Sequence, residues 1–153
     1  MTSQTTARSY TIREAAALTG LPASTLRYYE SIGVIAPVAR GASSGHRVYD
    51  EADLDQLMWV ACLAATGMSV SDMRAYVANG ARGAAAADEQ ITLLEGQERQ
   101  LAEEARQVVL RQRYVRIKID YWHAVRVGDH ARAEQLSAQA RRLADELRDS
   151  TKK

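Results

Sequence analysis

The fold is decided by residues 25–30, Thr-Leu-Arg-Tyr-Tyr-Glu, and by residues 45–50, Gly-His-Arg-Val-Tyr-Asp. The first stretch predicts a helix with a buried side, because Leu26 and Tyr29 lie three residues apart and share a face. Its other side offers hydroxyls and a guanidinium, the groups that bond to phosphate oxygens and base edges. The second stretch predicts a tight hairpin that presents Arg47. A helix and a basic wing at this spacing predict a compact surface for duplex DNA.

A further helix is predicted to precede this one. Thr11 predicts its N-cap, Glu14 three residues later completes a capping box, and Gly20 ends it. A short turn then leads into the helix that begins near Ser24 and reaches about Gly33. We therefore predict a helix–turn–helix. The outward side of its second helix carries a polar stripe, which has a simple solvated face as its alternative interpretation. The stripe consists of Ser24, Arg27, Tyr28 and Ser31.

The hairpin is predicted from two short apolar pairs, Val34-Ile35 and Val48-Tyr49. Residues 36–45 between them are rich in Pro, Gly and Ser, which predicts a connecting loop. A mobile surface loop is the alternative, but two arginines and no acid at this tip favour a wing that faces phosphate. The residues expected at or near the tip are Arg40, Ser43, Ser44, His46 and Arg47.

Two more helices are predicted to complete this head. Asp50 caps the third helix, Gly67 stops it, and Ser69 caps the fourth. Charge is segregated along the sequence, because residues 1–49 hold five arginines and two acids whereas residues 50–80 hold one arginine and five acids. Only the first part is therefore suited to face phosphate. The apolar side of the third helix is expected to consist of Leu54, Leu57, Met58, Ala61, Cys62 and Ala65.

A long helix is predicted from about Ala86 to Val127, where Pro is absent and Gly96 is the one interruption. Eight of ten positions on alternating three- and four-residue steps are apolar, which is typical of a coiled-coil seam. An exposed seam must pair, most simply with a second copy. After a turn, a short amphipathic helix is expected from Arg132 to Leu147. The seam consists of Ile91, Leu94, Glu98, Leu101, Ala105, Val108, Gln112, Val115, Ile119 and Trp122.

Several classes of protein are excluded by what the composition lacks. The single cysteine, Cys62, excludes an intramolecular disulfide and a multi-cysteine zinc site. No apolar run reaches about 18 residues, so we expect no membrane span. The polar residues 1–9 have no signal-peptide core, and we expect a cytoplasmic protein. Because no phosphate-cradling loop, metal cluster or activated nucleophile is present, we expect no cofactor, no metal and no enzymatic activity.

The order of these elements resembles the MerR family of bacterial transcription regulators. The resemblance implies a mostly α fold: a winged helix–turn–helix head at 10–80, a long antiparallel dimerisation helix at 86–127 and a short effector-region helix at 129–148. The matching residues are Tyr10-Thr11-Ile12, Ala15-Ala16, Leu26–Glu30, Gly33, Gly45–Tyr49, Asp53-Leu54 and Gly67-Met68-Ser69.

The resemblance also implies a function. A homodimer would bind a near-palindromic element in double-stranded promoter DNA, distort the spacer and realign the promoter for RNA polymerase. Arg27 and Tyr28 would contact DNA from the recognition helix, and Arg47 with Arg40 from the wing. His46 replaces the aromatic residue that is common at this wing position. The full expected DNA-binding set is Thr11, Arg13, Ser24, Thr25, Arg27, Tyr28, Arg40, Ser43, His46 and Arg47.

The resemblance leaves the effector open. Residues 117–129 hold none of the cysteines of the metal-sensing branch, and His123 and His130 are interpreted as surface residues. Cys62 matches the single cysteine of the aldehyde- and electrophile-responsive branch (the AdhR/NmlR type), against the alternative of an inert core residue. A small organic effector captured without a covalent bond is another possibility, with Tyr76, Tyr114, Tyr121 and Trp122 as its walls. The competing function is a coiled-coil adaptor whose head contacts protein.

Overall fold

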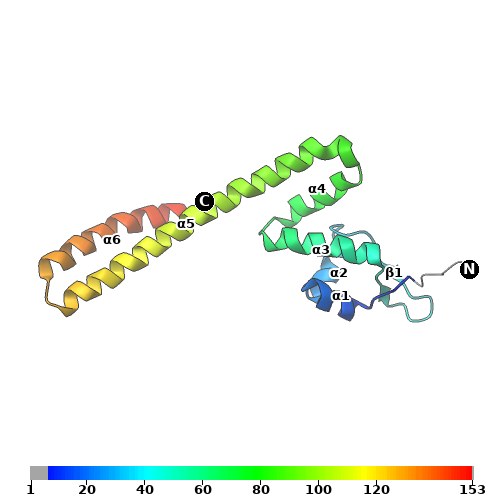
Figure 1. The fold of residues 1–153 in the computed structure, drawn as a ribbon, viewed down its shortest axis with the longest axis horizontal. Helices are drawn as coiled ribbons and strands as arrows, with labels where there is room; N and C mark the ends of the chain where they lie inside the picture. The colour runs from blue at the N-terminus through cyan, green and yellow to red at the C-terminus, as the bar shows by residue number, and fades with distance from the viewer. Residues whose placement is uncertain (1–6, 153) are drawn as a thin grey trace, which may run out of the picture. The chain divides into compact units, whose positions relative to one another are not determined.

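The structure, a computed structural model, describes residues 7–152, so part of the polar N-terminal segment lies outside the described residues. It divides into two compact units that meet within one helix, at Gln97 and Glu98. Among the described residues, no helix has both the length and the hydropathy that a bilayer crossing requires. The predicted mostly α fold with a small hairpin is confirmed (Figure 1). Its elements are α1 (Ile12–Thr19), α2 (Ala23–Ser31), β1 (Ala39–Arg40), β2 (Arg47–Val48), α3 (Glu51–Ala65), α4 (Val70–Gly80), the 3-10 turn η1 (Gly83–Ala86), α5 (Ala87–Arg126) and α6 (His130–Ser150).

The helix–turn–helix forms from local signals. Thr11 caps α1, and its hydroxyl accepts the Glu14 amide at 3.2 Å while the Glu14 carboxylate accepts the Thr11 amide at 3.2 Å. Gly20 ends α1 with φ of 74°, a left-handed conformation that glycine adopts without strain. The second helix begins at Ala23, one residue before Ser24, and it ends at Ser31 rather than near Gly33. The capping box and the stop at Gly20 are confirmed.

One hydrophobic core holds the first unit together. It takes Leu26 and Tyr29 from the inward face of α2, as the three-residue spacing predicts. Each helix from α1 to α4 contributes at least one buried side chain, and so do Val38 and Tyr49, which flank the two strands. The helix–turn–helix and the hairpin therefore pack on the same core. The buried members are Tyr10, Ala15, Leu26, Tyr29, Val34, Ile35, Val38, Tyr49, Leu54, Leu57, Val60, Met68 and Met73.

The first strand of the hairpin is not the one that the apolar pairs predict, whereas the second, Arg47–Val48, overlaps the predicted Val48-Tyr49 pair. β1 pairs antiparallel with β2, and Ala39 lies opposite Val48. Val34 and Ile35 are not a strand, because they are buried after the end of α2 with both amides donating to the Tyr29 carbonyl, at 2.9 and 3.3 Å. The prediction of a Val34-Ile35 strand was therefore wrong: the pair is apolar because it is core, and a buried loop and a buried strand have the same composition over two residues.

The buried side of α3 also differs from the prediction. Its buried residues are Leu54, Leu57 and Val60, while Met58 and Cys62 are exposed. The placement of Cys62 on the apolar side was wrong, because almost every residue from 57 to 65 is apolar and the sequence does not fix which side faces the core. The predicted caps are confirmed: the Asp50 side chain accepts the Asp53 amide at 2.7 Å, and Ser69 accepts the Asp72 amide at 3.1 Å.

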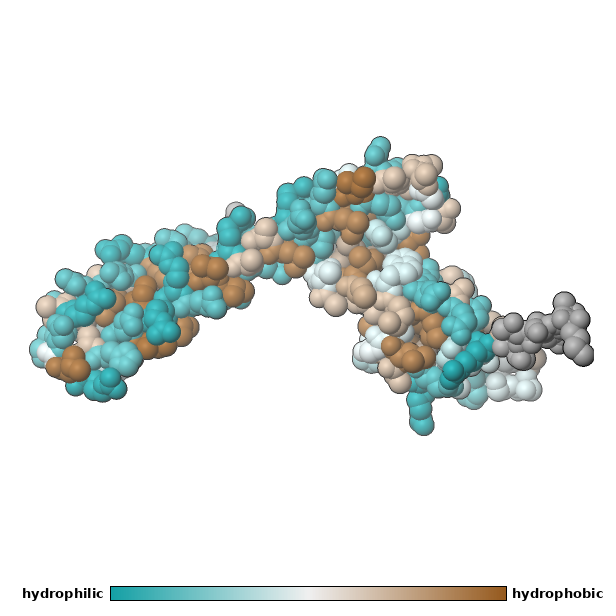
Figure 2. Space-filling model, viewed as in Figure 1, coloured by the Kyte–Doolittle hydropathy of each residue, from teal (hydrophilic) through white to brown (hydrophobic). Residues whose placement is uncertain are grey.

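The second unit contains the later part of α5 and all of α6. Asp129 caps α6, which begins at His130, two residues before the predicted start, and extends to Ser150, three residues beyond the predicted end. The two helices run side by side (Figure 1), and a small core of Ala124, Ala133 and Leu136 joins them. Hydrophobic side chains also reach the surface of this unit, as the brown areas of Figure 2 show. The division at 10–80, 86–127 and 129–148 stays a prediction.

Candidate nucleic-acid interface

A concave surface of about 610 Å³ lies in the first unit between the start of α1, α2 and the hairpin. It brings together residues that are far apart in the sequence, from Ser9 to Val48. Four arginines and several hydroxyls share this concavity, which gives it the donors that phosphate oxygens require. Of the expected DNA-binding residues, those that line it are Thr11, Arg13, Arg27, Arg40, His46 and Arg47.

The other expected residues lie outside this concavity. Ser24, Tyr28 and Ser43 are exposed, and Thr25 is half-buried. The Tyr28 side chain is 52% exposed next to the buried ring of Tyr29, with 6.3 Å between the ring centroids. The side chains of Ser24 and Tyr28 therefore extend the polar face of α2 beyond the concavity. Their part in DNA binding stays a prediction.

The hairpin is fastened to α2 by a carboxylate. The Nε atom of Arg47 donates to Oε2 of Glu30 at 2.6 Å, and both side chains are mostly buried, with exposed fractions of 19% and 14%. The amide of Val38 donates to the other oxygen of Glu30 at 3.4 Å. Burial opposes the charge on Glu30, but the two donors outweigh it, so the pKa of this carboxyl lies below its ordinary value. The sequence did not identify this pair.

The wing is also braced from within. The Nη1 atom of Arg40 donates to the Gly45 carbonyl at 3.1 Å, across the loop between β1 and β2. The amide of His46 donates to the hydroxyl of Ser44 at 3.3 Å. Arg40 thus closes the loop through its guanidinium, and it also lines the concavity. Ser44, which also lines the concavity, was placed at the tip by the sequence but not counted among the DNA-binding residues.

A second set of contacts ties the segment before α1 to the end of the hairpin. Tyr10 and Tyr49 exchange both backbone hydrogen bonds, at 2.8 and 2.9 Å. The Tyr10 hydroxyl donates to Oε1 of Glu51 at 2.7 Å, and this bond with burial raises the pKa of the Tyr10 hydroxyl. The guanidinium of Arg8 lies over the Tyr10 ring, 5.0 Å from its centroid. Arg8 is a cation beside the interface that the expected set omits, because no motif marks it.

The chemistry of this surface is that of anion binding. The free amides at the start of α1 carry partial positive charge, and Arg13 lies in that first turn. The two acids of the region are both engaged, Glu14 in the capping box and Glu30 with the wing. Within residues 7–152 there is no group of three or more His, Cys, Asp or Glu side chains placed to hold a metal ion.

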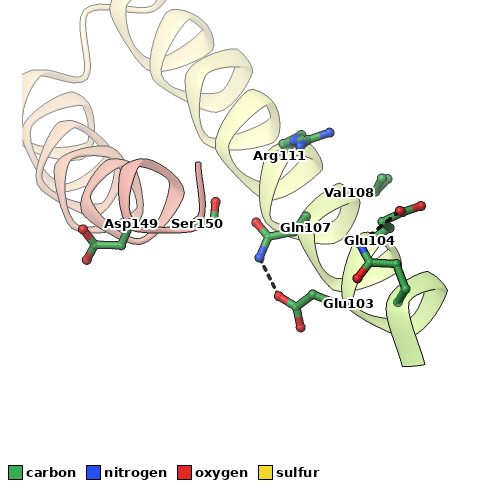
Figure 3. Close-up of a pocket in the computed structure, with 8 residues that line it drawn as sticks. Glu103, Glu104, Gln107, Val108, Arg111, Asp149 and Ser150 are labelled. Carbon is green, nitrogen blue, oxygen red and sulfur yellow. Dashed lines mark hydrogen bonds between the residues drawn. The ribbon is translucent and has the colours of Figure 1, made fainter. Parts of the chain in front are cut away.

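The second unit has a cavity of a different character, about 820 Å³, between α5 and the end of α6 (Figure 3). Its lining includes the acids Glu103, Glu104 and Asp149. Gln107 donates to Oε1 of Glu103 at 3.0 Å, which Figure 3 marks with a dashed line. The lining holds three carboxylates and one guanidinium, that of Arg111, so its charge suits phosphate less well than the concavity of the first unit.

Comparison with known proteins agrees with this geometry. The MerR HTH family of regulatory proteins matches residues 10–79. The HTH-type transcriptional regulator YyaN of Bacillus subtilis is 41% identical over 71 residues, which are 46% of this chain and 51% of YyaN. AdhR, an HTH-type transcriptional regulator of the same organism, is 44% identical over 57 residues, which are 37% of this chain and 40% of AdhR. The matched part thus spans about half or less of these relatives.

A solved structure extends the similarity beyond the head. HiNmlR, a MerR family regulator lacking the sensor domain, was crystallised bound to promoter DNA. It is 28% identical, the alignment covers 84% of this chain and 96% of HiNmlR, and the TM-score is 0.61. The helix–turn–helix, the hairpin and these matches lead to one conclusion. Residues 10–79 form a MerR-family helix–turn–helix domain, and the chain is similar over most of its length to a MerR family regulator that was crystallised bound to promoter DNA.

Proposed function

We propose that two copies of this chain bind a near-palindromic promoter element and control transcription from it. Each copy inserts α2 into a major groove, with Arg27 and Tyr28 toward the bases and the hairpin on the flanking backbone. The observation that carries this proposal is the concavity in which Arg13, Arg27, Arg40 and Arg47 converge from two helices and both strands of the hairpin. The expected residues outside it, Ser24, Thr25 and Ser43, contact phosphate at its margins.

The dimer forms through α5. Its seam is exposed in the single chain, with Val115 56% and Trp122 63% exposed, and an apolar stripe of this kind requires a partner. Charge supports an antiparallel pair: residues 88–104 hold six acids and one arginine, and residues 105–126 hold six Lys or Arg and one acid. Antiparallel pairing sets each acidic half against a basic half, whereas parallel pairing would set like charges together.

Binding on both sides of the spacer gives the dimer a way to act on DNA shape. A rigid pair of heads held at a fixed separation binds a bent or untwisted spacer better than a straight one when the half-sites are out of register. The deformation realigns the promoter boxes for RNA polymerase. This mechanism requires no catalysis by the protein, and each relative named above is a transcriptional regulator.

A small effector sets the balance between the active and inactive dimer. The exposed thiol of Cys62 on α3 favours an electrophile over an inert core role, because an exposed thiol is accessible to an aldehyde. The thiol sulfur would add to the carbonyl carbon, and the proton that the thiol loses would pass to the carbonyl oxygen, which gives a hemithioacetal. A non-covalent organic effector is the other candidate. Treating parent and Cys62→Ser with an aldehyde in a transcription assay distinguishes them: an equal response of the two excludes the thiol.

The proposal is tested with duplexes selected from a random pool by the parent protein. Binding of the parent, of Arg27→Ala and of Arg142→Ala is measured across a salt series. Arg142 is the matched control, since it is an exposed arginine on α6, outside the concavity. We expect Arg27→Ala to lose about tenfold or more in affinity and Arg142→Ala to bind as the parent does. Equal binding by Arg27→Ala, or no salt-dependent duplex binding by the parent, would contradict the proposal.

A further inference from the structure

Glu30 is a residue near the proposed DNA interface whose presence DNA contact does not explain. It is an acid in the basic part of the chain, on the recognition helix and within reach of the surface that binds phosphate. A carboxylate there repels DNA by its charge alone. Yet the structure fixes it firmly, with 14% of its side chain exposed. Its position requires a reason other than contact with DNA.

The two carboxylate oxygens of Glu30 accept hydrogen bonds from both sides of the hairpin. Oε2 accepts Nε of Arg47 on β2, at 2.6 Å, and Oε1 accepts the amide of Val38, the residue before β1, at 3.4 Å. Arg47 also lines the concavity, so the bond to Glu30 fixes a residue of that surface. One side chain on α2 therefore sets both the placement of the hairpin and the direction in which Arg47 is presented.

Only a carboxylate makes both bonds. It has two acceptor oxygens and no donor, whereas the amide of glutamine has one acceptor oxygen and a donor NH₂ group that would face either Arg47 or Val38. Aspartate has the charge but is shorter by one methylene. A further anchor, the Gln56 side chain, accepts the Ala36 amide at 3.2 Å, but it holds the chain before the hairpin rather than the hairpin itself.

We propose that Glu30 is the positioning residue of the DNA interface, which locks the wing and the Arg47 guanidinium in register with the recognition helix. This inference rests on the proposed DNA-binding function and adds to it a residue that itself does not contact DNA. The wing and α2 then meet the duplex as one preorganised surface, so no binding free energy is lost in ordering the hairpin.

The sign of the effect distinguishes positioning from simple charge. If Glu30 were only an acid near DNA, its neutralisation would strengthen binding, because a repulsive charge would be gone. If it positions the wing, the same change weakens binding. Glu14 supplies the matched control: it is an acid that lines the same concavity, and glutamine keeps its capping box.

The experiment measures duplex affinity of the parent, Glu30→Gln and Glu14→Gln on the selected operator, with thermal unfolding of each protein to show that it is folded. We expect Glu30→Gln to bind about tenfold more weakly and Glu14→Gln to bind more tightly than the parent. Hydroxyl-radical footprinting supplies a second readout. In Glu30→Gln the protections at the wing are lost while those at α2 remain, which a general loss of structure would not produce.

A double-mutant cycle tests whether Glu30 acts through Arg47. We expect the combined loss for Glu30→Gln with Arg47→Ala to be smaller than the sum of the two single losses, because one of the two groups that Glu30 positions is then absent. Additive losses of affinity, or tighter binding by a folded Glu30→Gln variant, would overturn the positioning role. The proposed function would still stand in that case, provided that the parent binds the duplex. If the parent shows no duplex binding, the proposed function fails and this inference fails with it.

Discussion

The backbone bridge between Tyr10 and Tyr49 joins two tyrosines whose hydroxyls are in opposite situations, and this difference can be tested by mutation. The Tyr49 side chain is fully buried, and its hydroxyl has no hydrogen-bond partner among the described residues. Burial raises the pKa of this hydroxyl. A buried hydroxyl without a partner costs about 1–3 kcal/mol. Tyr49→Phe removes that cost and keeps the ring and both backbone bonds to Tyr10, so we expect it to stabilise the protein by about 1 kcal/mol.

The opposite change is expected at Tyr10, the other member of the same bridge. Its hydroxyl donates to Glu51 at 2.7 Å, so Tyr10→Phe loses a hydrogen bond and lowers the melting temperature. Thermal unfolding of the parent and both variants, at one protein concentration, measures the two effects. A gain of 1 kcal/mol raises Tm by roughly 2–8 °C for chains of this size range. A fall in Tm for Tyr49→Phe would refute the reasoning, since it would mean that the hydroxyl is satisfied.

Three further outcomes are expected. Folding lowers the pKa of Glu30, so the ionised carboxylate stabilises the folded protein fully above the ordinary carboxyl value of 4.5. This contribution is lost as the pH falls through the lowered pKa. The difference in Tm between the parent and Glu30→Gln should therefore disappear in acid. Trp122→Asp, at an exposed seam position, should dissociate the dimer in sedimentation, and unchanged association would exclude the seam. Cys62→Ser should bind the operator as the parent does, because the thiol lies on α3 outside the concavity, and a change measured by titration would contradict that.

The sequence predicted what depends on neighbouring residues. Thr11 with Glu14 and Asp50 with Asp53 each form a capping box from residues three apart, and such signals need no knowledge of the rest of the chain. The inward face of α2 was predicted for the same reason, because Leu26 and Tyr29 share a side of any helix. The long helix followed from its periodicity.

Features that depend on contacts between distant parts of the chain could not be predicted from local signals. Val34 and Ile35 have the composition of a strand, but they pack into the core directly after α2 and form a buried loop instead. The side of α3 that faces the core is chosen by packing, since Val60 and Cys62 are both apolar enough to be buried. The bond between Glu30 and Arg47 joins residues 17 positions apart, and no local rule connects them.

The central claim is that two heads, joined through α5, read a symmetric site in duplex DNA. Its most direct test combines the mass of the protein–operator complex in analytical ultracentrifugation with footprinting on the same duplex. We predict two chains per duplex and two equivalent protected patches related by a dyad, about 34 Å or a multiple of it apart. A single chain per duplex, or one protected patch without a symmetry mate, would contradict the claim.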